Sequence, residues 1–192
     1  MDWNKFGKID IVLASASPSR KLLFDKAEID CKVIVSGVDE TVPPKSTPAE
    51  TVEILAERKG QAVFGQCSGK MIISADSVIV IDGEICGKPE NEEAAEKMLA
   101  KLSGRVHEVF TGVCILYKGK KIVFSQSTEV EFYNLSSAEI SNYVASGESL
   151  GRAGSYGIEG KGMVLIKGIR GDYSNIVGIP IAETFRRASE LV

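Results

Sequence analysis

The chain has 192 residues, of which 44% are hydrophobic and 26% are charged, and its formal net charge is −3. These values are typical of a soluble globular protein, and they give no electrostatic case for a nucleic-acid polymer or an anionic membrane as a partner, because such partners usually select a basic face. The length fits a single domain over residues 1–192, or one domain with two lobes.

The cysteines and the first residues bear on the compartment. Four cysteines lie far apart with no CxxC pair, so neither a zinc knuckle nor a redox dithiol is indicated. The opening stretch MDWNKFGKID lacks the apolar core of a signal peptide, and no apolar run is long enough to cross a bilayer. We therefore expect a cytoplasmic protein.

Hydrophobic periodicity and capping residues predict an alternation of strands and helices. In chain order these are a strand at 9–14, a helix at 18–26, a strand at 31–38, a helix from 47 to 64 or 66, strands within 71–81, a helix at 91–102, two long strands at 106–117 and 122–132, a helix at 136–146 and a helix at 180–191. The mixture, with its long hairpin, predicts an α/β fold with a mixed sheet and flanking helices.

Asp76 is the most informative residue, because it lies inside the most apolar stretch of the chain, 71–81. A carboxylate in such a strand is costly unless it is paired, hydrogen-bonded or bound to a metal. The stretch then turns into Gly87-Lys88-Pro89, which adds a cation after the acid. The pair indicates chemistry on a phosphate or near a metal. The alternative interpretation is that Asp76 merely caps a bend between two strands.

Further polar groups gather near the predicted strand ends. The turn at 15–21 combines the hydroxyls of Ser15 and Ser17, two cations and a helix N-terminus capped by Ser17, which together suit a phosphate, although an ordinary capped helix explains it too. Asp39 and Glu40 follow a strand and are placed to hold a divalent cation, or they lie in a solvated loop. Lys59 lies on an apolar helix face, where it either extends to solvent or reaches the same phosphate.

A glycine-rich segment at 147–171 holds eight glycines, which imply tight turns or backbone close to a ligand. A planar base fits against such a segment, with Glu159 reading its edge. A plain connection between elements is the alternative. His107 is the only histidine, so a His-based triad is excluded, and we expect a strand histidine satisfied locally. Taken together, the clusters predict a metal-dependent site for a phosphorylated, nucleotide-like small molecule.

At this point the chain resembles the Maf family of nucleoside triphosphate pyrophosphatases over nearly its whole length. The similar motifs are, in order, LASASPSR at 13–20, SADS at 74–77 with GKP at 87–89, LSGRVH at 102–107 with TG at 111–112, AGSYGIEG at 153–160 and VGIP at 177–180. The resemblance implies an elongated mixed sheet with flanking helices and two lobes around a cleft, distantly like the inosine triphosphate pyrophosphatases. It also implies hydrolysis of a nucleoside triphosphate to monophosphate and pyrophosphate, a divalent metal, a cytoplasmic location and often a homodimer.

The resemblance also assigns residues. Asp76 matches the proposed proton acceptor, and the conserved polar site is matched by Ser15, Arg20, Glu40, Lys59 and Lys88. On this basis we expect the following roles: catalysis by Asp76, Lys88 and Glu40, phosphate or substrate binding by Ser15, Ser17, Arg20 and Lys59, and Mg²⁺ or Mn²⁺ held by Glu40 and Asp76.

Substrate preference depends on three positions where the chain departs from the family. The thymidine/uridine triphosphate branch usually has Arg, Thr and Gln there, and the 7-methylguanosine triphosphate branch has Trp, Gln and Glu, whereas this chain has Ser19, Ser77 and Glu159. A carboxylate accepts the N–H groups of a guanine edge, so Glu159 favours guanine, while Ser77 is small and hydroxylic like Thr. We take dTTP and UTP as the first expectation and a 7-methyl-GTP or other modified-nucleotide pyrophosphatase as the alternative.

Two further functions remain open from the sequence. One is a septation regulator that acts by binding without catalysis, although a binding module has no need of a buried acid beside a lysine. The other is a phosphatase or transferase acting on nucleotide sugars, which shares the phosphate chemistry. The products formed from nucleotides distinguish all three.

Overall fold

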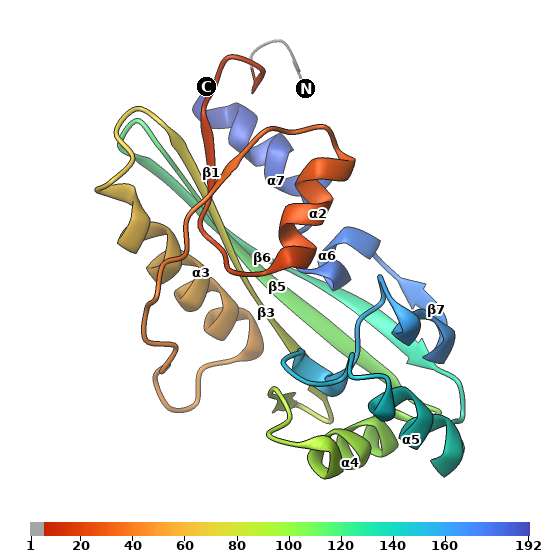
Figure 1. Ribbon diagram of the computed structural model, residues 1–192. Helices are drawn as coiled ribbons and strands as arrows, with labels where there is room; N and C mark the ends of the chain where they lie inside the picture. Colours follow the sequence, from red (N-terminus) through yellow and green to blue (C-terminus); the bar gives the residue numbers. More distant parts are fainter. Residues whose placement is uncertain (1–5) are drawn as a thin grey trace. The chain divides into compact units, whose positions relative to one another are not determined.

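The computed structural model describes residues 6–192, so the first five residues of the opening stretch considered above lie outside the described residues (Figure 1). Within this range seven strands form one sheet in the order β2-β1-β3-β5-β6-β7, with β4 paired to β3. The strands are β1 (Ile11–Leu13), β2 (Lys32–Val33), β3 (Met71–Ile81), β4 (Glu84–Cys86), β5 (Val106–Tyr117), β6 (Lys120–Phe132) and β7 (Ile166–Arg170).

The sheet is mixed in strand direction. Strand β1 is parallel to both β2 and β3, whereas β4 is antiparallel to β3 and β7 is antiparallel to β6. Helices connect and flank the strands (Figure 1). The predicted α/β class with a mixed sheet is therefore confirmed.

The helices are α2 (Pro18–Lys26), α3 (Pro48–Phe64), α4 (Glu92–Leu102), α5 (Ser137–Ala145), α6 (Tyr173–Val177) and α7 (Ile181–Ala188), with short 3₁₀ turns η1 (Ala153–Ser155), η2 (Lys161–Leu165) and η3 (Ser189–Leu191). Helices α2, α3, α4 and α5 begin at or next to the capping residues that predict them. The side chains of Ser17, Thr47, Asn91 and Ser136 each accept a hydrogen bond from the backbone N–H three residues later. These caps satisfy amides that have no partner within the helix.

Several elements differ from expectation. The strand predicted at 31–38 pairs only over Lys32–Val33. None of the residues 31–38 is buried, so further pairing would not be stabilised by the burial of apolar side chains. Strand β7 and helix α6 were not predicted. Strand β7 lies in the glycine-rich segment, where glycine weakens the strand pattern, and it forms because β6 offers an antiparallel partner. The helix predicted to Leu191 ends at Ala188 and continues as η3.

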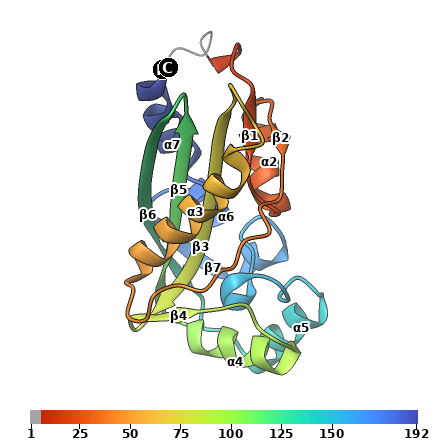
Figure 2. The same cartoon turned by 90° about the vertical axis from the view of Figure 1, so that its left-hand side faces the viewer.

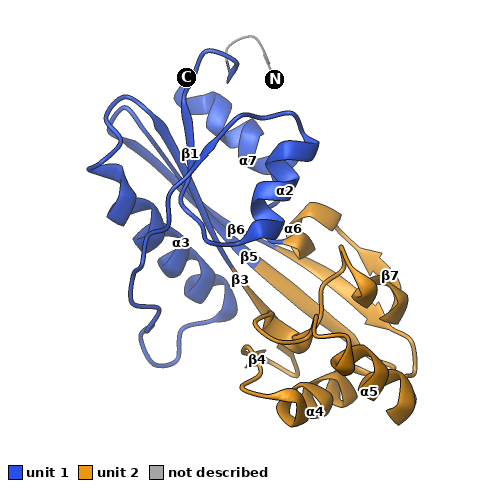
Figure 3. Cartoon of the chain, viewed as in Figure 1, with its two compact units in different colours: residues 1–76, 111–126, 178–192 blue, residues 77–110, 127–177 orange. Residues whose placement is uncertain are grey.

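The described chain divides into two compact units (Figure 3). Unit 1 comprises residues 1–76, 111–126 and 178–192, and unit 2 comprises residues 77–110 and 127–177. Strands β3, β5 and β6 contribute residues to both. Two compact units agree with the predicted two lobes, while the expected cleft remains a prediction.

Each unit has its own apolar core. In unit 1, helix α3 packs on alternate residues of β1, β3 and β5 (Figure 2), and this core contains Val12, Ala14, Ala56, Val63, Cys67, Ile72, Cys114 and Leu116. In unit 2 the core is built by β5, β6, α4, α5 and the glycine-rich segment. None of the helices described between residues 6 and 192 combines the length and apolar character that a membrane span needs.

Candidate active site

Helix α3 and strand β3 position the acid that the sequence singles out. In a strand, alternate residues share a face, so Asp76 lies on the same face of β3 as Ser74. Ser74 Oγ donates to the carbonyl of Ala56 on α3 at 2.6 Å. One helical turn further along α3, Lys59 Nζ lies 2.5 Å from Asp76 Oδ1. The helix is thus tied to the strand next to the acid and supplies its cation.

Two glycines allow α3 to lie this close to the sheet. A Cβ at Gly112 of β5 would stand 2.3 Å from the backbone carbonyl of Val52, and one at Gly60 of α3 would stand 2.7 Å from Ser74 Oγ. Contacts below about 3 Å require the backbone or the side chain to move. The backbones of β5 and α3 thus approach each other closely at Gly112, and this approach sets the distance over which Lys59 reaches Asp76.

Lys59 contacts two carboxylates at once. Besides Asp76, its ammonium lies 2.7 Å from Glu40 Oε1. The side chains of Lys59 and Asp76 are 12% and 13% exposed, whereas that of Glu40 is 56% exposed. Lys59 and Asp76 are thus mostly shielded from solvent, and Glu40 is the exposed member of the group. The bend-cap interpretation of Asp76 does not account for this arrangement, because the carboxylate is held by a lysine from another element.

Arg58 holds the loop that carries Glu40. Its Nη1 donates to the backbone carbonyls of Asp39 at 2.6 Å and Thr41 at 2.7 Å, on either side of Glu40. The backbone N–H and hydroxyl of Thr41 both donate to the Asp39 carboxylate, and these bonds lower the pKa of that acid. Asp39 therefore also has partners inside the loop, and its expected part in holding a cation stays a prediction. Arg58 was missed, since a helix arginine beside Lys59 has no distinctive pattern.

The turn before α2 carries the second cation. Arg20 is 9% exposed; its Nε donates to the Gly178 carbonyl at 2.7 Å and its Nη1 to Ser15 Oγ at 3.2 Å. Ser15 Oγ also accepts from the backbone N–H of Ser17, and Ser17 Oγ caps α2 through the Arg20 N–H. The hydroxyls predicted to meet a phosphate therefore also organise the turn. Gly178 was missed, because its role is a tertiary contact far along the chain.

Arg20, Asp76 and Glu40 act on one another electrostatically. Burial lowers the pKa of Arg20, and the Asp76 and Glu40 carboxylates oppose that effect. A guanidinium remains charged under all these conditions. Unit 1 therefore gathers two cations, Arg20 and Lys59, with two carboxylates, and this is the mixture of charges that binds a metal-bound polyphosphate.

The remaining predicted residues divide between the units. Ser19 lies half-buried on α2 in unit 1. In unit 2, Ser77 is half-buried on β3 directly after Asp76, and Lys88 is exposed in the segment after β4. Glu159 is 11% exposed and forms an ion pair with Arg152 at 2.7 Å.

His107 lies on strand β5, as expected, and is buried in unit 2, but only one of its two ring nitrogens has a hydrogen-bond partner among the described residues. It is 2% exposed, and its Nε2 lies 2.7 Å from the Tyr156 hydroxyl, while Nδ1 has no hydrogen-bond partner among the described residues. Burial lowers the pKa of His107 to about 4 and raises that of Tyr156. The ring is therefore neutral near pH 7 and supports the segment around Tyr156.

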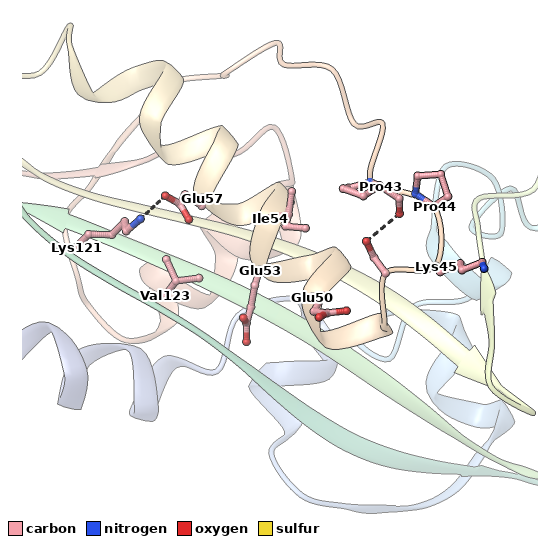
Figure 4. Close-up of a pocket in the computed structure, with 10 residues that line it drawn as sticks. Pro43, Pro44, Lys45, Glu50, Glu53, Ile54, Glu57, Lys121 and Val123 are labelled. Atoms are coloured by element: carbon pink, nitrogen blue, oxygen red, sulfur yellow. Dashed lines mark hydrogen bonds and ion pairs between the residues drawn. The ribbon is translucent and has the colours of Figure 1, made fainter.

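A surface pocket of about 570 Å³ lies elsewhere in unit 1, between the loop 43–46, the first half of α3 and the start of β6 (Figure 4). Its acids have partners inside the protein: Glu50 accepts from Thr47, Glu53 from Ser125, and Glu57 pairs with Lys121. None of the residues predicted for catalysis or phosphate binding lines this pocket. It is therefore separate from the candidate site.

The donor set of the site fits a hard divalent cation. No group of three or more His, Cys, Asp or Glu side chains suited to a metal is present among residues 6–192. Asp76 and Glu40, however, already face one cation, the Lys59 ammonium, from two sides. Mg²⁺ is usually held by one or two carboxylates together with substrate phosphates and water, so two acids suffice for an ion that is also bound by the substrate.

Fold and site together define a class. An α/β protein with a lysine-paired acid in its sheet, a buried arginine at a strand-to-helix turn and an exposed second acid has the groups of a phosphate-anhydride hydrolase. The comparisons agree: the model of the family "Maf-like protein" matches residues 10–191. The chain belongs to the Maf family, and the resemblance drawn from its motifs is confirmed.

Similar proteins are found among bacilli. One from Bacillus mycoides (strain KBAB4), called dTTP/UTP pyrophosphatase, is 45% identical over 180 residues, which are 94% of each chain. Another of the same name, from Bacillus cereus (strain B4264), is 44% identical over 180 residues and 94% of each chain. Among solved structures, the Staphylococcus aureus Ham1 protein aligns with a TM-score of 0.43 and 22% identity over 64% of this chain and 71% of its own.

Proposed function

We propose that this chain hydrolyses nucleoside triphosphates, with dTTP and UTP preferred, to the nucleoside monophosphate and pyrophosphate. The observation that carries the proposal is the Lys59 ammonium held between Asp76 and Glu40 within a Maf-family chain. The names of its relatives from Bacillus mycoides and Bacillus cereus support the same reaction and the same two substrates. A role in removing surplus or non-canonical nucleotides fits this chemistry.

The cations of unit 1 would bind the triphosphate. Arg20 is fixed by Gly178 and Ser15, so its guanidinium is preorganised for a phosphate oxygen. Lys59 is paired with Asp76 and Glu40, and a triphosphate offers the ammonium more negative charge than these two carboxylates together. We therefore expect Lys59 to shift towards the substrate. Ser15 and Ser17 add hydroxyls at the start of α2.

Asp76 would then act as the proton acceptor. Once Lys59 engages the phosphates, the Asp76 carboxylate can accept a proton from a water molecule that attacks phosphorus. A bound Mg²⁺ or Mn²⁺, held by Glu40 and Asp76, would supply Lewis-acid stabilisation of charge on the phosphate oxygens. Glu40 is suited to this because it is more exposed than Asp76 and Arg58 fixes its loop. Lys88, in unit 2, remains proposed as a further cation that stabilises charge on the triphosphate.

A nucleotide panel tests the proposal. Purified protein is incubated with Mg²⁺ or Mn²⁺ and with dTTP, UTP, CTP, GTP, ATP and 7-methyl-GTP, and monophosphate, diphosphate, pyrophosphate and phosphate are quantified. We expect monophosphate and pyrophosphate in equal amounts, fastest from dTTP and UTP, and loss of activity in EDTA that is restored by excess metal. Preference for 7-methyl-GTP would favour the alternative substrate, and no hydrolysis of any triphosphate would favour a septation regulator that acts by binding.

Assembly and location are part of the proposal. We infer a homodimer and a cytoplasmic location from membership of the Maf family. Light scattering coupled to size-exclusion chromatography gives the mass in solution, for which a dimer is expected. A mass equal to one chain of 20.6 kDa would contradict the dimer.

A further inference from the structure

The glycine-rich segment of unit 2 is held in a defined place beside β3. The Gly154 N–H donates to the Gly87 carbonyl at 3.2 Å, next to Lys88, and a Cβ at Gly154 would stand 2.4 Å from Ile79 Cδ1. Ile79 and Ser77 are two residues apart on β3 and share a face. The segment therefore lies on the side of the strand that carries Ser77.

Arg152 and Glu159 face each other across this segment. Arg152 Nη1 lies 2.7 Å from Glu159 Oε1, and the two side chains are 33% and 11% exposed. The guanidinium lies directly on Gly157, where a Cβ would stand 2.2 Å from Nη1. The Gly157 N–H donates to the Tyr143 hydroxyl at 3.3 Å, which fixes the backbone beneath the arginine. The pair is thus built into the segment.

The Glu159 carboxylate stabilises the charged form of Arg152. Burial lowers the pKa of Arg152, but its hydrogen bond to Glu159 and the nearby negative charges raise it by more, so the pKa is raised overall. The side chains accordingly form an ion pair in which one Glu159 oxygen, Oε1, accepts from the arginine.

This contact changes what Glu159 can recognise. A guanine edge presents two adjacent N–H donors, which a carboxylate meets with both of its oxygens. A uracil or thymine edge presents an N–H donor between two carbonyl acceptors, which needs a donor beside an acceptor. A carboxylate already bound through Oε1 to a guanidinium is a poorer match for guanine. The guanidinium and carboxylate together supply both kinds of group, as a carboxamide does.

We propose that Arg152 is a specificity-determining residue: by pairing with Glu159 it turns that carboxylate from a reader of guanine edges into half of a donor–acceptor pair that fits uracil and thymine. The inference rests on the proposed function, which it deepens by naming the base class and the residue that selects it. It also removes the conflict between Ser77 and Glu159, because both then agree with a pyrimidine.

The test compares UTP with GTP in four variants. Arg152→Met keeps the packing on Gly157 but removes the pair, and we expect the UTP/GTP ratio of kcat/KM to fall by about tenfold or more, as expected for a hydrogen bond to a charged group. Glu159→Gln is expected to keep the ratio within about threefold of wild type, because an amide also supplies a donor and an acceptor. Combining both changes should restore the ratio. Arg170→Ala, which breaks the exposed pair with Glu129 in the same unit, should leave it unchanged.

Binding separates this proposal from the proposed function. Dissociation constants are measured in parallel for the non-hydrolysable α,β-methylene analogues of UTP and GTP. If the wild type hydrolyses neither nucleotide, the proposed function fails. The preference for the UTP analogue, taken as the dissociation constant of the GTP analogue divided by that of the UTP analogue, then tests Arg152 in the same way. The proposal is overturned if Arg152→Met leaves the ratio within about twofold of wild type, or if Glu159→Gln raises it about tenfold, which would mean that Glu159 reads guanine despite Arg152. A ratio, unlike an activity, is not moved by a merely structural loss.

Discussion

Lys59 joins the two carboxylates of the site and is the first residue to test. Lys59→Ala removes the cation expected to move onto the triphosphate, and kcat/KM for UTP should fall by about 10²–10³, as for the loss of one electrostatic contact in comparable sites. Lys121→Ala is a matched control, because it breaks an ion pair between α3 and β6 in the same unit, with Glu57, outside the site.

The variants are compared by steady-state kinetics after circular dichroism has confirmed folding. Because the Lys59–Asp76 pair is half-buried, removal of the lysine alone also leaves a poorly solvated carboxylate and lowers stability. An activity of Lys59→Ala equal to that of Lys121→Ala would contradict the role of Lys59.

His107 makes stability depend on pH. Its folded pKa of about 4 lies below the ordinary histidine value, so the unfolded chain binds a proton more readily than the folded chain. This contribution is present above pH ~6.5 and is lost as the pH falls towards 4. Between pH 7 and pH 5 the loss is on the order of 2 kcal/mol.

The change is measured by chemical unfolding of the wild type and of His107→Phe at both pH values. His107→Phe gives up the contact with Tyr156 but has no proton to bind, so its stability should change less between pH 7 and pH 5. Equal changes in the two proteins would show that His107 does not titrate in this way.

At the scale of elements, the close packing of α3 on the sheet places Lys59 beside Asp76. Gly112→Ala would place a Cβ against the backbone of Val52, which cannot rotate away, so we expect a loss of about 1–3 kcal/mol in unfolding free energy and a fall in kcat as Lys59 moves from Asp76. Gly65→Ala is the matched control at the end of the same helix: it meets nothing within 4 Å, has a helical backbone, and should be neutral or slightly stabilising.

Thermal and urea unfolding of both glycine variants, with UTP kinetics, checks this expectation. If Gly112→Ala were as stable and as active as Gly65→Ala, close packing of α3 would not determine the site.

What sequence predicts at this scale follows from how local the signal is. Helices α2, α3, α4 and α5 begin at or next to the predicted residues because each capping interaction joins residues only three positions apart. Strand β7 was missed because it exists through pairing with β6, and strand β2 is shorter than predicted because its side chains are exposed.

The same reasoning applies to the site. Asp76 was found because an acid in an apolar strand is anomalous in itself. The roles of Arg58 and Gly178 are contacts with residues 19 and 158 positions away, and no local pattern encodes them.

For the whole molecule, membership of the Maf family and the ion pairs of unit 1 support the proposed account, in which a triphosphate bound by Arg20 and Lys59 would be attacked by a water molecule that Asp76 deprotonates. The family relation explains why the motifs run along nearly the whole chain. The first part of β3, with Asp76, belongs to unit 1, and Ser77 begins unit 2, so a single strand carries both the proposed proton acceptor and a proposed specificity residue.

The most direct test is Asp76→Asn compared with Asp82→Asn. Asp82 follows the same strand in an exposed turn, pairs with Arg105 and has a left-handed backbone that asparagine also adopts. With dTTP and Mg²⁺, we predict that Asp76→Asn folds but loses at least about 10²-fold in kcat, because the amide cannot accept the proton from water. Asp82→Asn should form monophosphate and pyrophosphate like the wild type. Formation of both products by Asp76→Asn at the wild-type rate would contradict the account.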